Sequence, residues 1–220
     1  KDSKSHVAWM SGGDFFGSEI ATTVQAATNV RIELAGSDGA VTVLKAKLPL
    51  KAGEIIDAAV MSRKALRAFF AEQIEAAKKD GVLFSLHVKA TMMKIADPII
   101  FGHAVSEFFA DVIEKHAATL KKLGVNLNNG FGDLLSKIET LPAAEKDAIK
   151  ADIKAEYAKR PALAMVNSDK GITGLHVPSD FNIDATRPAM IRESGRMWGP
   201  AGKLQYAIGG IPDRAYATVY

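Results

Sequence analysis

Two ionisable residues stand where an apolar run of this sequence ends. Lys89 directly follows the run VLFSLHV, and Asp184 directly follows the shorter run FNI. Open α/β sheets bind ligands outside the carboxyl ends of their strands, so two parallel neighbouring strands would place both side chains on one edge of the sheet. An aspartate supplies an oxygen ligand for a hard divalent cation, and a lysine supplies a group for acid or base chemistry. The two positions therefore favour a proton-transfer site with a divalent cation.

Each position also has an ordinary structural interpretation. A lysine at a strand end is usually a solvated surface residue. An aspartate ahead of ATRPAM is usually an N-cap or a turn residue. Position alone leaves both interpretations open for Lys89 and for Asp184. The polar loop at residues 167–176 follows another apolar run and is a third place for a site, although a plain loop is the favoured interpretation.

The better-known catalytic motifs are not found in this sequence. The five histidines are scattered, and no two have the HxxxH or HExxH spacing that places imidazoles on one helical face. His87 lies within an expected strand, and we interpret it as a hydrogen-bonded sheet residue. The sequence contains no GxSxG nucleophile elbow and no GxxxxGK[ST] phosphate loop.

The composition excludes several classes of protein. The chain has 220 residues, of which 48% are hydrophobic and 24% are charged, as in an ordinary globular protein. The lack of cysteine excludes a disulfide scaffold, a thiolate metal site and a cysteine nucleophile. The net charge of +3 comes from interleaved basic and acidic residues, which argues against nucleic acid as a partner. No apolar run approaches the ~18 residues of a membrane span, and the start KDSKSHVAWM has no signal-peptide core, so we expect a cytoplasmic protein without a membrane partner.

Strand and helix patterns alternate along the chain. The nearly continuous apolar run at residues 82–88 predicts a strand buried on both faces, and shorter runs predict strands at residues 163–166 and 181–183. We expect Ser62 as the N-cap of the first helix, Gly81 as its C-cap, and Ile99 on the buried side of the second helix. Apolar spacing predicts helices at residues 62–80, 99–123, 131–139, 143–159 and 188–194.

This alternation predicts an α/β fold, with a mixed, mostly parallel sheet flanked by helices. Alternating residues on both sides of the turn GSDG predict a small antiparallel hairpin at residues 27–47, which we expect at the periphery. No Pro/Gly/Ser-rich linker divides the sequence, so we expect residues 1–220 to form a single α/β domain. The chain begins at Lys1 and ends in PDRAYATVY, which alternates like a strand, so we expect it to be part of a longer chain.

Three long strings of this sequence resemble one protein family. They are SLHVKATMMKIADPIIFGHAV, ALAMVNSDKGITGLHVPSDFNIDATRPAMIRESGRMWGP and IPDRAYATVY. They closely resemble the monomeric NADP-dependent isocitrate dehydrogenases of bacteria, and the resemblance runs through essentially the whole chain. That family is a single large chain several times this length. The resemblance therefore implies an internal piece of its large domain, monomeric when complete.

The resemblance also implies a reaction and two site residues. The family oxidises isocitrate with NADP and decarboxylates it to 2-oxoglutarate, a step of the tricarboxylic acid cycle, with Mg²⁺ or Mn²⁺. Its catalytic lysine, in the segment KATMMK, matches Lys89, which the resemblance also makes a substrate-binding residue. One of its metal-binding aspartates matches Asp184. Isocitrate and NADP are the partners that the resemblance implies.

Much of the family's site lies outside these residues. Its substrate-binding serine, asparagine and arginines precede Lys1, while its catalytic tyrosine, further metal aspartates and most NADP-binding residues follow Tyr220. Neither Tyr216 nor Tyr220 matches that tyrosine. We therefore expect the isolated chain to be inactive and to carry no cofactor-binding residues of its own. The alternative interpretation is a non-catalytic α/β module or an anion-binding fragment.

Overall fold

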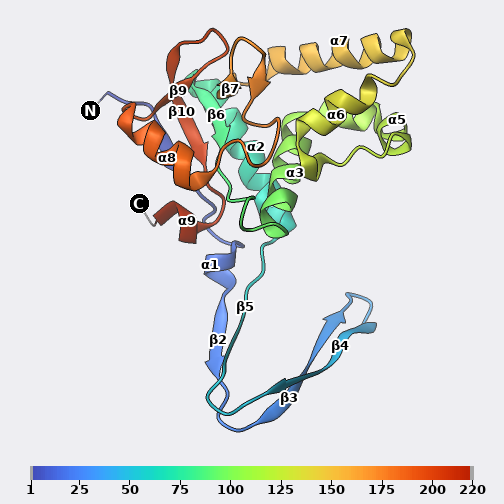
Figure 1. The fold of residues 1–220 in the computed structure, drawn as a ribbon, viewed down its shortest axis with the longest axis vertical. Helices are drawn as coiled ribbons and strands as arrows, with labels where there is room; N and C mark the ends of the chain where they lie inside the picture. The colour runs from blue at the N-terminus through green and yellow to red at the C-terminus, as the bar shows by residue number, and fades with distance from the viewer. Residues whose placement is uncertain (1, 219–220) are drawn as a thin grey trace.

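The chain forms a body of helices around a small sheet, and a two-stranded arm projects from this body (Figure 1). The computed structural model describes residues 2–218, without the side chain of residue 218. The expected α/β class is confirmed, since helices and strands share one core. Within the described residues, no helix is both long enough and apolar enough to cross a membrane.

The central sheet is mixed. Its strands are β1 (His6–Ala8), β6 (Leu83–Leu86), β9 (Arg196–Trp198) and β10 (Leu204–Gly210). Strand β10 lies in the middle, where it pairs in parallel with β1 on one side and with β6 on the other. Strand β9 pairs with β10 in the antiparallel sense. Strand β6 was predicted from its apolar run, whereas β1, β9 and β10 were not predicted.

The two other predicted strands are mostly wrong. Leu163 makes a single parallel bridge to Phe84, and the chain then forms β7 (Met165–Asn167), which pairs with β8 (Ile172–Thr173). The run at residues 181–183 is not a strand, because it contributes only one parallel bridge, from Asn182 to Val88. Both runs nevertheless lie alongside β6 in the parallel sense.

Helix α8 (Ile183–Arg192) explains why the run FNI is not a strand. The Asn182 side chain accepts a hydrogen bond from the Asp184 amide at 3.0 Å, so it caps the helix and starts it at Ile183. The helix expected at residues 188–194 therefore begins five residues earlier than predicted. Asp184 lies in the first turn of α8, not at the end of a strand.

Helix α2 (Arg63–Asp80) confirms the helix that was predicted at residues 62–80. The Ser62 hydroxyl accepts a hydrogen bond from the Ala65 amide at 3.2 Å. Gly81 ends the helix in the left-handed region, with φ of 65°. The apolar face of α2 is buried in the main core cluster, where it packs against β6 and β10.

The long helix expected at residues 99–123 is wrong as a single element. The chain instead forms α3 (Ala96–Phe108), α4 (Ala110–Lys115) and α5 (Ala117–Lys122). The helix is interrupted at Phe109, whose ring stacks on Phe131 at 3.8 Å between centroids, and at His116, which bonds Asp152 at 2.6 Å. Ile99 is 45% exposed, so its expected burial is also wrong. Both interruptions lie at tertiary contacts that local periodicity does not reveal.

Helices α6 (Phe131–Ile138) and α7 (Ala143–Lys159) lie on one side of the body, away from α1 (Phe15–Ser18) and α9 (Arg214–Thr218) (Figure 1). The first two are the helices predicted at residues 131–139 and 143–159. A further short element is the 3₁₀ turn η1 (Leu127–Asn129). The strand expected from PDRAYATVY is wrong over residues 214–218, because Asp213 accepts the Ala215 amide at 3.2 Å and starts α9. Its last two residues lie outside the described part.

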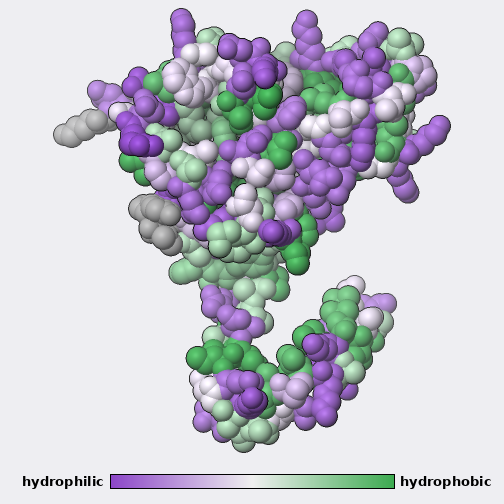
Figure 2. Space-filling view, in the orientation of Figure 1, coloured by the Kyte–Doolittle hydropathy of each residue, from purple (hydrophilic) through white to green (hydrophobic). Residues whose placement is uncertain are grey.

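The arm is built from two antiparallel ribbons. Strand β2 (Ile20–Thr23) pairs with β5 (Ile55–Ala58), and β3 (Thr28–Ala35) pairs with β4 (Val41–Leu50). The second ribbon contains the hairpin expected at residues 27–47, and Figure 1 shows it extending away from the sheet. Apolar side chains on this ribbon face solvent, as the green surface in Figure 2 indicates. They include Ile32, Leu34, Val41, Val43 and Leu44.

Candidate functional site

Lys89 and Asp184 form an ion pair. The Lys89 Nζ atom lies 2.7 Å from the Asp184 Oδ2 atom, with the lysine side chain 19% exposed and the aspartate side chain 45% exposed. The strand-end argument placed both side chains on one edge of the sheet on the condition that both runs were parallel strands, and the two side chains do lie together. Asp184, however, reaches the site from the first turn of α8, because the element before it is a helix cap and not a strand.

The backbone after β6 joins this strand to α8. The Val88 amide donates to the Phe181 carbonyl at 3.2 Å, and the Ile183 amide donates to the Val88 carbonyl at 3.0 Å. These two bonds hold the start of α8 against the residue that precedes Lys89. Asp184, one residue beyond Ile183, is therefore held next to Lys89 by main-chain hydrogen bonds.

His87 makes a second link between β6 and α8. Its Nε2 atom lies 2.7 Å from the Ser85 hydroxyl, and its Nδ1 atom lies 2.9 Å from the Thr186 hydroxyl. The Thr186 hydroxyl donates to the Asn182 carbonyl at 2.7 Å, so it accepts from Nδ1, and Nε2 accepts from Ser85. Burial, aided by the positive charge of Arg187, lowers the pKa of His87 to about 4, so the ring is neutral. His87 is thus hydrogen-bonded, as expected, although it lies one residue beyond strand β6.

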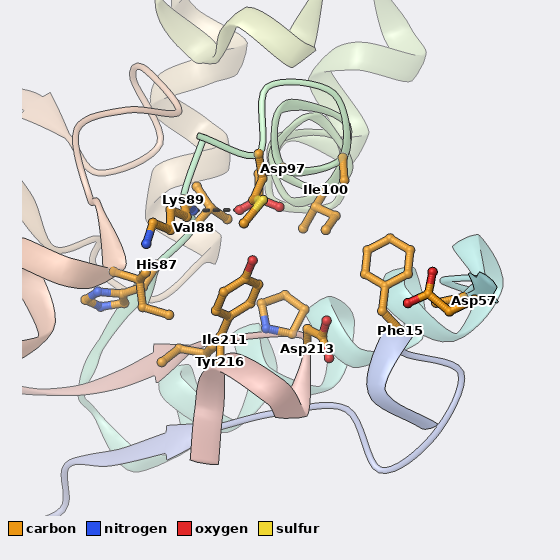
Figure 3. A pocket seen from close by; sticks show the side chains of 15 residues that line it. Phe15, Asp57, His87, Val88, Lys89, Asp97, Ile100, Ile211, Asp213 and Tyr216 are labelled. Atoms are coloured by element: carbon orange, nitrogen blue, oxygen red, sulfur yellow. Dashed lines mark hydrogen bonds between the residues drawn. The ribbon is translucent and has the colours of Figure 1, made fainter. Parts of the chain in front are cut away.

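A cavity of about 510 Å³ lies at the carboxyl ends of β6 and β10. Residues 87–89 follow β6 and residues 211–213 follow β10, so both strands contribute to its wall. Figure 3 shows Lys89, Asp97 and Tyr216 around this space, with the Tyr216 hydroxyl directed into it. This is the edge at which open α/β sheets bind ligands.

Two buried carboxylates in this cavity were not singled out from the sequence. Asp97 is 5% exposed, and Asp213 is 7% exposed. Burial raises the pKa of Asp97, and the neighbouring Asp213 charge adds to this effect. Burial and the charges of Asp97 and Asp213 also raise the pKa of Tyr216, which keeps its hydroxyl protonated. Asp97 occurs within the string that carries the family resemblance, but nothing in its spacing indicated a contact with Lys89.

The site offers one candidate metal ligand. Asp184 presents a half-exposed carboxylate, whose oxygen atoms suit a hard divalent cation. Across residues 2–218, no group of three or more histidine, aspartate or glutamate side chains is arranged to hold a metal ion. Asp184 can therefore act as one member of a ligand set, but the described residues do not complete that set.

A tricarboxylate also needs arginine side chains that bind carboxylates in a bidentate manner. Arg187, in α8, is only 4% exposed, and its two terminal nitrogens donate to the carbonyls of Tyr216 and Ala217 at 2.7 and 3.0 Å. Its guanidinium group therefore attaches α9 to α8 and does not face the cavity edge as a substrate-binding group.

These features define an α/β protein with a lysine–carboxylate pair at the carboxyl edge of its sheet. A sequence model described as monomeric isocitrate dehydrogenase matches residues 1–220, so the chain belongs to that family. This confirms the resemblance seen in the sequence.

Individual relatives agree with this family. The chain is 62% identical over 219 residues to "Isocitrate dehydrogenase [NADP]" of Azotobacter vinelandii, covering 100% of this chain and 30% of that protein. It is 58% identical over 220 residues to "Isocitrate dehydrogenase [NADP] 2" of Colwellia maris, again covering 100% and 30%. It is 48% identical over 218 residues to "Isocitrate dehydrogenase [NADP] 2" of Mycobacterium tuberculosis, covering 99% and 29%. The chain thus spans about 30% of the length of these curated relatives.

Proposed function

We propose that this chain supplies the catalytic lysine and one metal-binding carboxylate of an NADP-dependent isocitrate dehydrogenase. The reaction oxidises isocitrate with NADP and then decarboxylates the product to 2-oxoglutarate. The observation that supports this most directly is the Lys89–Asp184 ion pair, 2.7 Å long, beside a cavity at the carboxyl edge of the sheet. Lys89 is the proposed catalytic and substrate-binding residue, and Asp184 is the proposed metal ligand.

The chemistry of Asp184 fits a divalent cation. Its carboxylate is 45% exposed and pairs with Lys89, which lines the cavity, so it can offer one oxygen to Mg²⁺ or Mn²⁺. When bound, such a cation supplies Lewis-acid polarisation of substrate oxygens, and NADP supplies the hydride acceptor. The remaining ligands would come from substrate, water and segments outside this chain, because Mg²⁺ usually takes only one or two protein carboxylates.

Lys89 is placed to move a proton or to balance negative charge. Oxidation of the isocitrate alcohol releases the hydroxyl proton, and loss of CO₂ leaves an enolate that must be protonated. The Lys89 Nζ atom lies at the edge where these groups would bind, with its side chain 19% exposed. It would take up or donate a proton at Nζ, or stabilise the developing oxyanion with its ammonium charge.

The rest of the site belongs to segments outside the chain. We propose that residues 1–220 form one α/β domain within the large domain of a longer, monomeric, cytoplasmic protein, and that NADP binds mainly outside these residues. The chain spans about 30% of the length of its relatives, which supports this proposal. The engagement of Arg187 with backbone carbonyls also supports it, because substrate carboxylates then need arginines from elsewhere.

A second candidate function is a non-catalytic α/β module that only binds an anion. The observation that favours it is the incomplete ligand set, since residues 2–218 hold no cluster of three potential metal ligands. Such a module would bind its ligand without any requirement for NADP or for a divalent cation.

Substitution of Lys89 separates these two functions. In the complete protein, we expect Lys89→Met to lower kcat by ~10²–10⁴-fold, the usual effect of losing a positioned acid or base. Lys94→Met is the matched control, because Lys94 is exposed in the same loop and carries the same charge. Isocitrate-dependent NADPH formation is the measurement. Activity of Lys89→Met within threefold of the parent would refute the proposed role.

A further inference from the structure

The loop that follows Lys89 is closed by hydrogen bonds at both of its ends. The Lys89 carbonyl accepts from the amides of Met92 and Met93 at 3.0 and 2.8 Å. The Lys89 amide donates to the Oδ2 atom of Asp97 at 2.6 Å, and the Asp97 amide donates to the Met93 carbonyl at 3.2 Å. Both backbone groups of Lys89 are therefore bonded to the segment that enters α3.

Asp97 acts on the main chain of Lys89 and not on its amine. Figure 3 shows the bond from the Lys89 amide to Asp97, while the Lys89 amine points away from this carboxylate. The amine instead pairs with Asp184. Asp97 and Asp184 thus contact opposite ends of the same residue, one at the backbone and one at the side chain.

Because Asp97 is buried, its carboxylate depends on the hydrogen bond to the Lys89 amide. The residue is 5% exposed, and a buried carboxylate loses hydration that only hydrogen bonds and nearby positive charge can offset. Its place in the first turn of α3 is favourable, because the helix N-terminus attracts negative charge. The other titratable groups that line the same cavity are Asp57, His87, Lys89, Asp213 and Tyr216.

We propose that Asp97 is a positioning residue for the catalytic lysine. This proposal rests on the proposed function and extends it to a residue for which no role follows from the sequence. Val88 is already bonded to residues 181 and 183 through both its backbone groups. Asp97 then holds the amide of the following residue, Lys89. These bonds together fix the backbone at Lys89, and therefore the direction in which its side chain reaches the cavity edge.

Three variants test this role in the complete protein. Asp97→Ala and Asp97→Leu remove the acceptor of the Lys89 amide, whereas Asp97→Asn keeps an oxygen in the same place. We expect Ala and Leu to lower kcat by ~10–100-fold, because small displacements of a reacting group cost that much. We expect Asn to stay within threefold of the parent. The leucine variant fills the space of the carboxylate, so the test does not depend on whether an alanine cavity is tolerated.

A double substitution separates an effect of Asp97 through Lys89 from a general disruption of the fold. If Asp97 acts through Lys89, then Asp97→Leu lowers kcat in the parent but has no further effect in Lys89→Met. An equal loss in both backgrounds would refute the positioning role. If Lys89→Met is itself active, the proposed function fails. The contact between Asp97 and the Lys89 amide is then tested by amide hydrogen exchange alone.

Amide hydrogen exchange gives a readout that needs no activity. In the complete protein, we expect slow exchange of the Lys89 amide in the parent and in Asp97→Asn. Loss of the acceptor in Asp97→Leu should make this exchange at least ~10-fold faster, while the Val88 amide stays protected by its own bond. Unchanged protection of Lys89 in Asp97→Leu would overturn the proposal.

Discussion

Asp14 tests how the segment near the start of the chain is attached to α9, through its contacts with Arg214. Its carboxylate, which is fully buried, accepts from the Nε and Nη2 atoms of Arg214, each at 2.9 Å. It also accepts from the backbone amides of Arg214 at 3.0 Å and of Gly17 at 3.1 Å. The Arg214 side chain is the largest cause that lowers the pKa of Asp14 to about 2, against the opposing effect of burial.

The size of the effect follows from this pKa. The difference between 3.8 and about 2 corresponds to roughly 2–3 kcal/mol, at ~1.36 kcal/mol per pH unit. The Arg214 side chain is 26% exposed, so solvent screens part of the attraction. We therefore expect Asp14→Asn to lower the free energy of unfolding by ~1–2 kcal/mol at pH 7. Because the folded pKa is depressed, this stabilisation is fully present above pH 3.8 and is lost as the pH falls towards 2.

Urea unfolding of the 220-residue chain and of Asp14→Asn is the assay, at pH 7 and again near pH 3. The difference between the two proteins should be largest at pH 7 and should shrink at the lower pH. Asp111→Asn is the matched control, because the ion pair of Asp111 with Lys159 is about 60% exposed at both residues and such pairs contribute little. Equal stability of parent and Asp14→Asn at pH 7 would refute the reasoning, as would a difference that does not depend on pH.

Three further outcomes are expected. Asp184→Asn in the complete protein should raise the Mg²⁺ or Mn²⁺ concentration needed for half-maximal turnover, because an amide lacks the charge of a carboxylate ligand. If this concentration and kcat are both unchanged, Asp184 is only a helix residue. The 220-residue chain, given isocitrate, Mn²⁺ and NADP, should form no NADPH above background, and Lys89-dependent turnover would show that the rest of the site was misassigned. The stability of the chain should rise with pH between about 4 and 6.5, because His87 is neutral when folded but protonates when unfolded. His87→Gln should flatten this dependence in urea titrations, and an unchanged slope would contradict the assignment.

The sequence located Lys89 and Asp184 relative to each other better than it predicted the sheet. The rule that ligands bind at strand ends places both residues on one edge, and their atoms lie 2.7 Å apart. It succeeded although the run before Asp184 is no strand, because Asn182 and its neighbours still bond to Val88 in the parallel sense. The roles of the two residues came from the family resemblance and stay predictions until the variants are measured.

What sequence reasoning missed depends on contacts between distant segments. Strand β10 contains two glycines and a polar start, LQYAIGG, so its pattern resembles a loop until β1 and β6 are known to flank it. The breaks at Phe109 and His116 arise from contacts with α6 and α7. The bond from Lys89 to Asp97 joins residues eight positions apart, a contact that neither apolar periodicity nor a motif indicates.

The order of strands in the sheet has a consequence for synthesis of the protein. Within the described part of this sheet, β1 is translated before β6, and its partner β10 comes last. His6 therefore cannot pair with Ile208 until about 200 further residues have been translated. Helices α2 to α7 close through nearer contacts and can assemble earlier. If translation stalls before β10, these helices pack beside a sheet that lacks its middle strand. Chaperones and proteases would act on this intermediate.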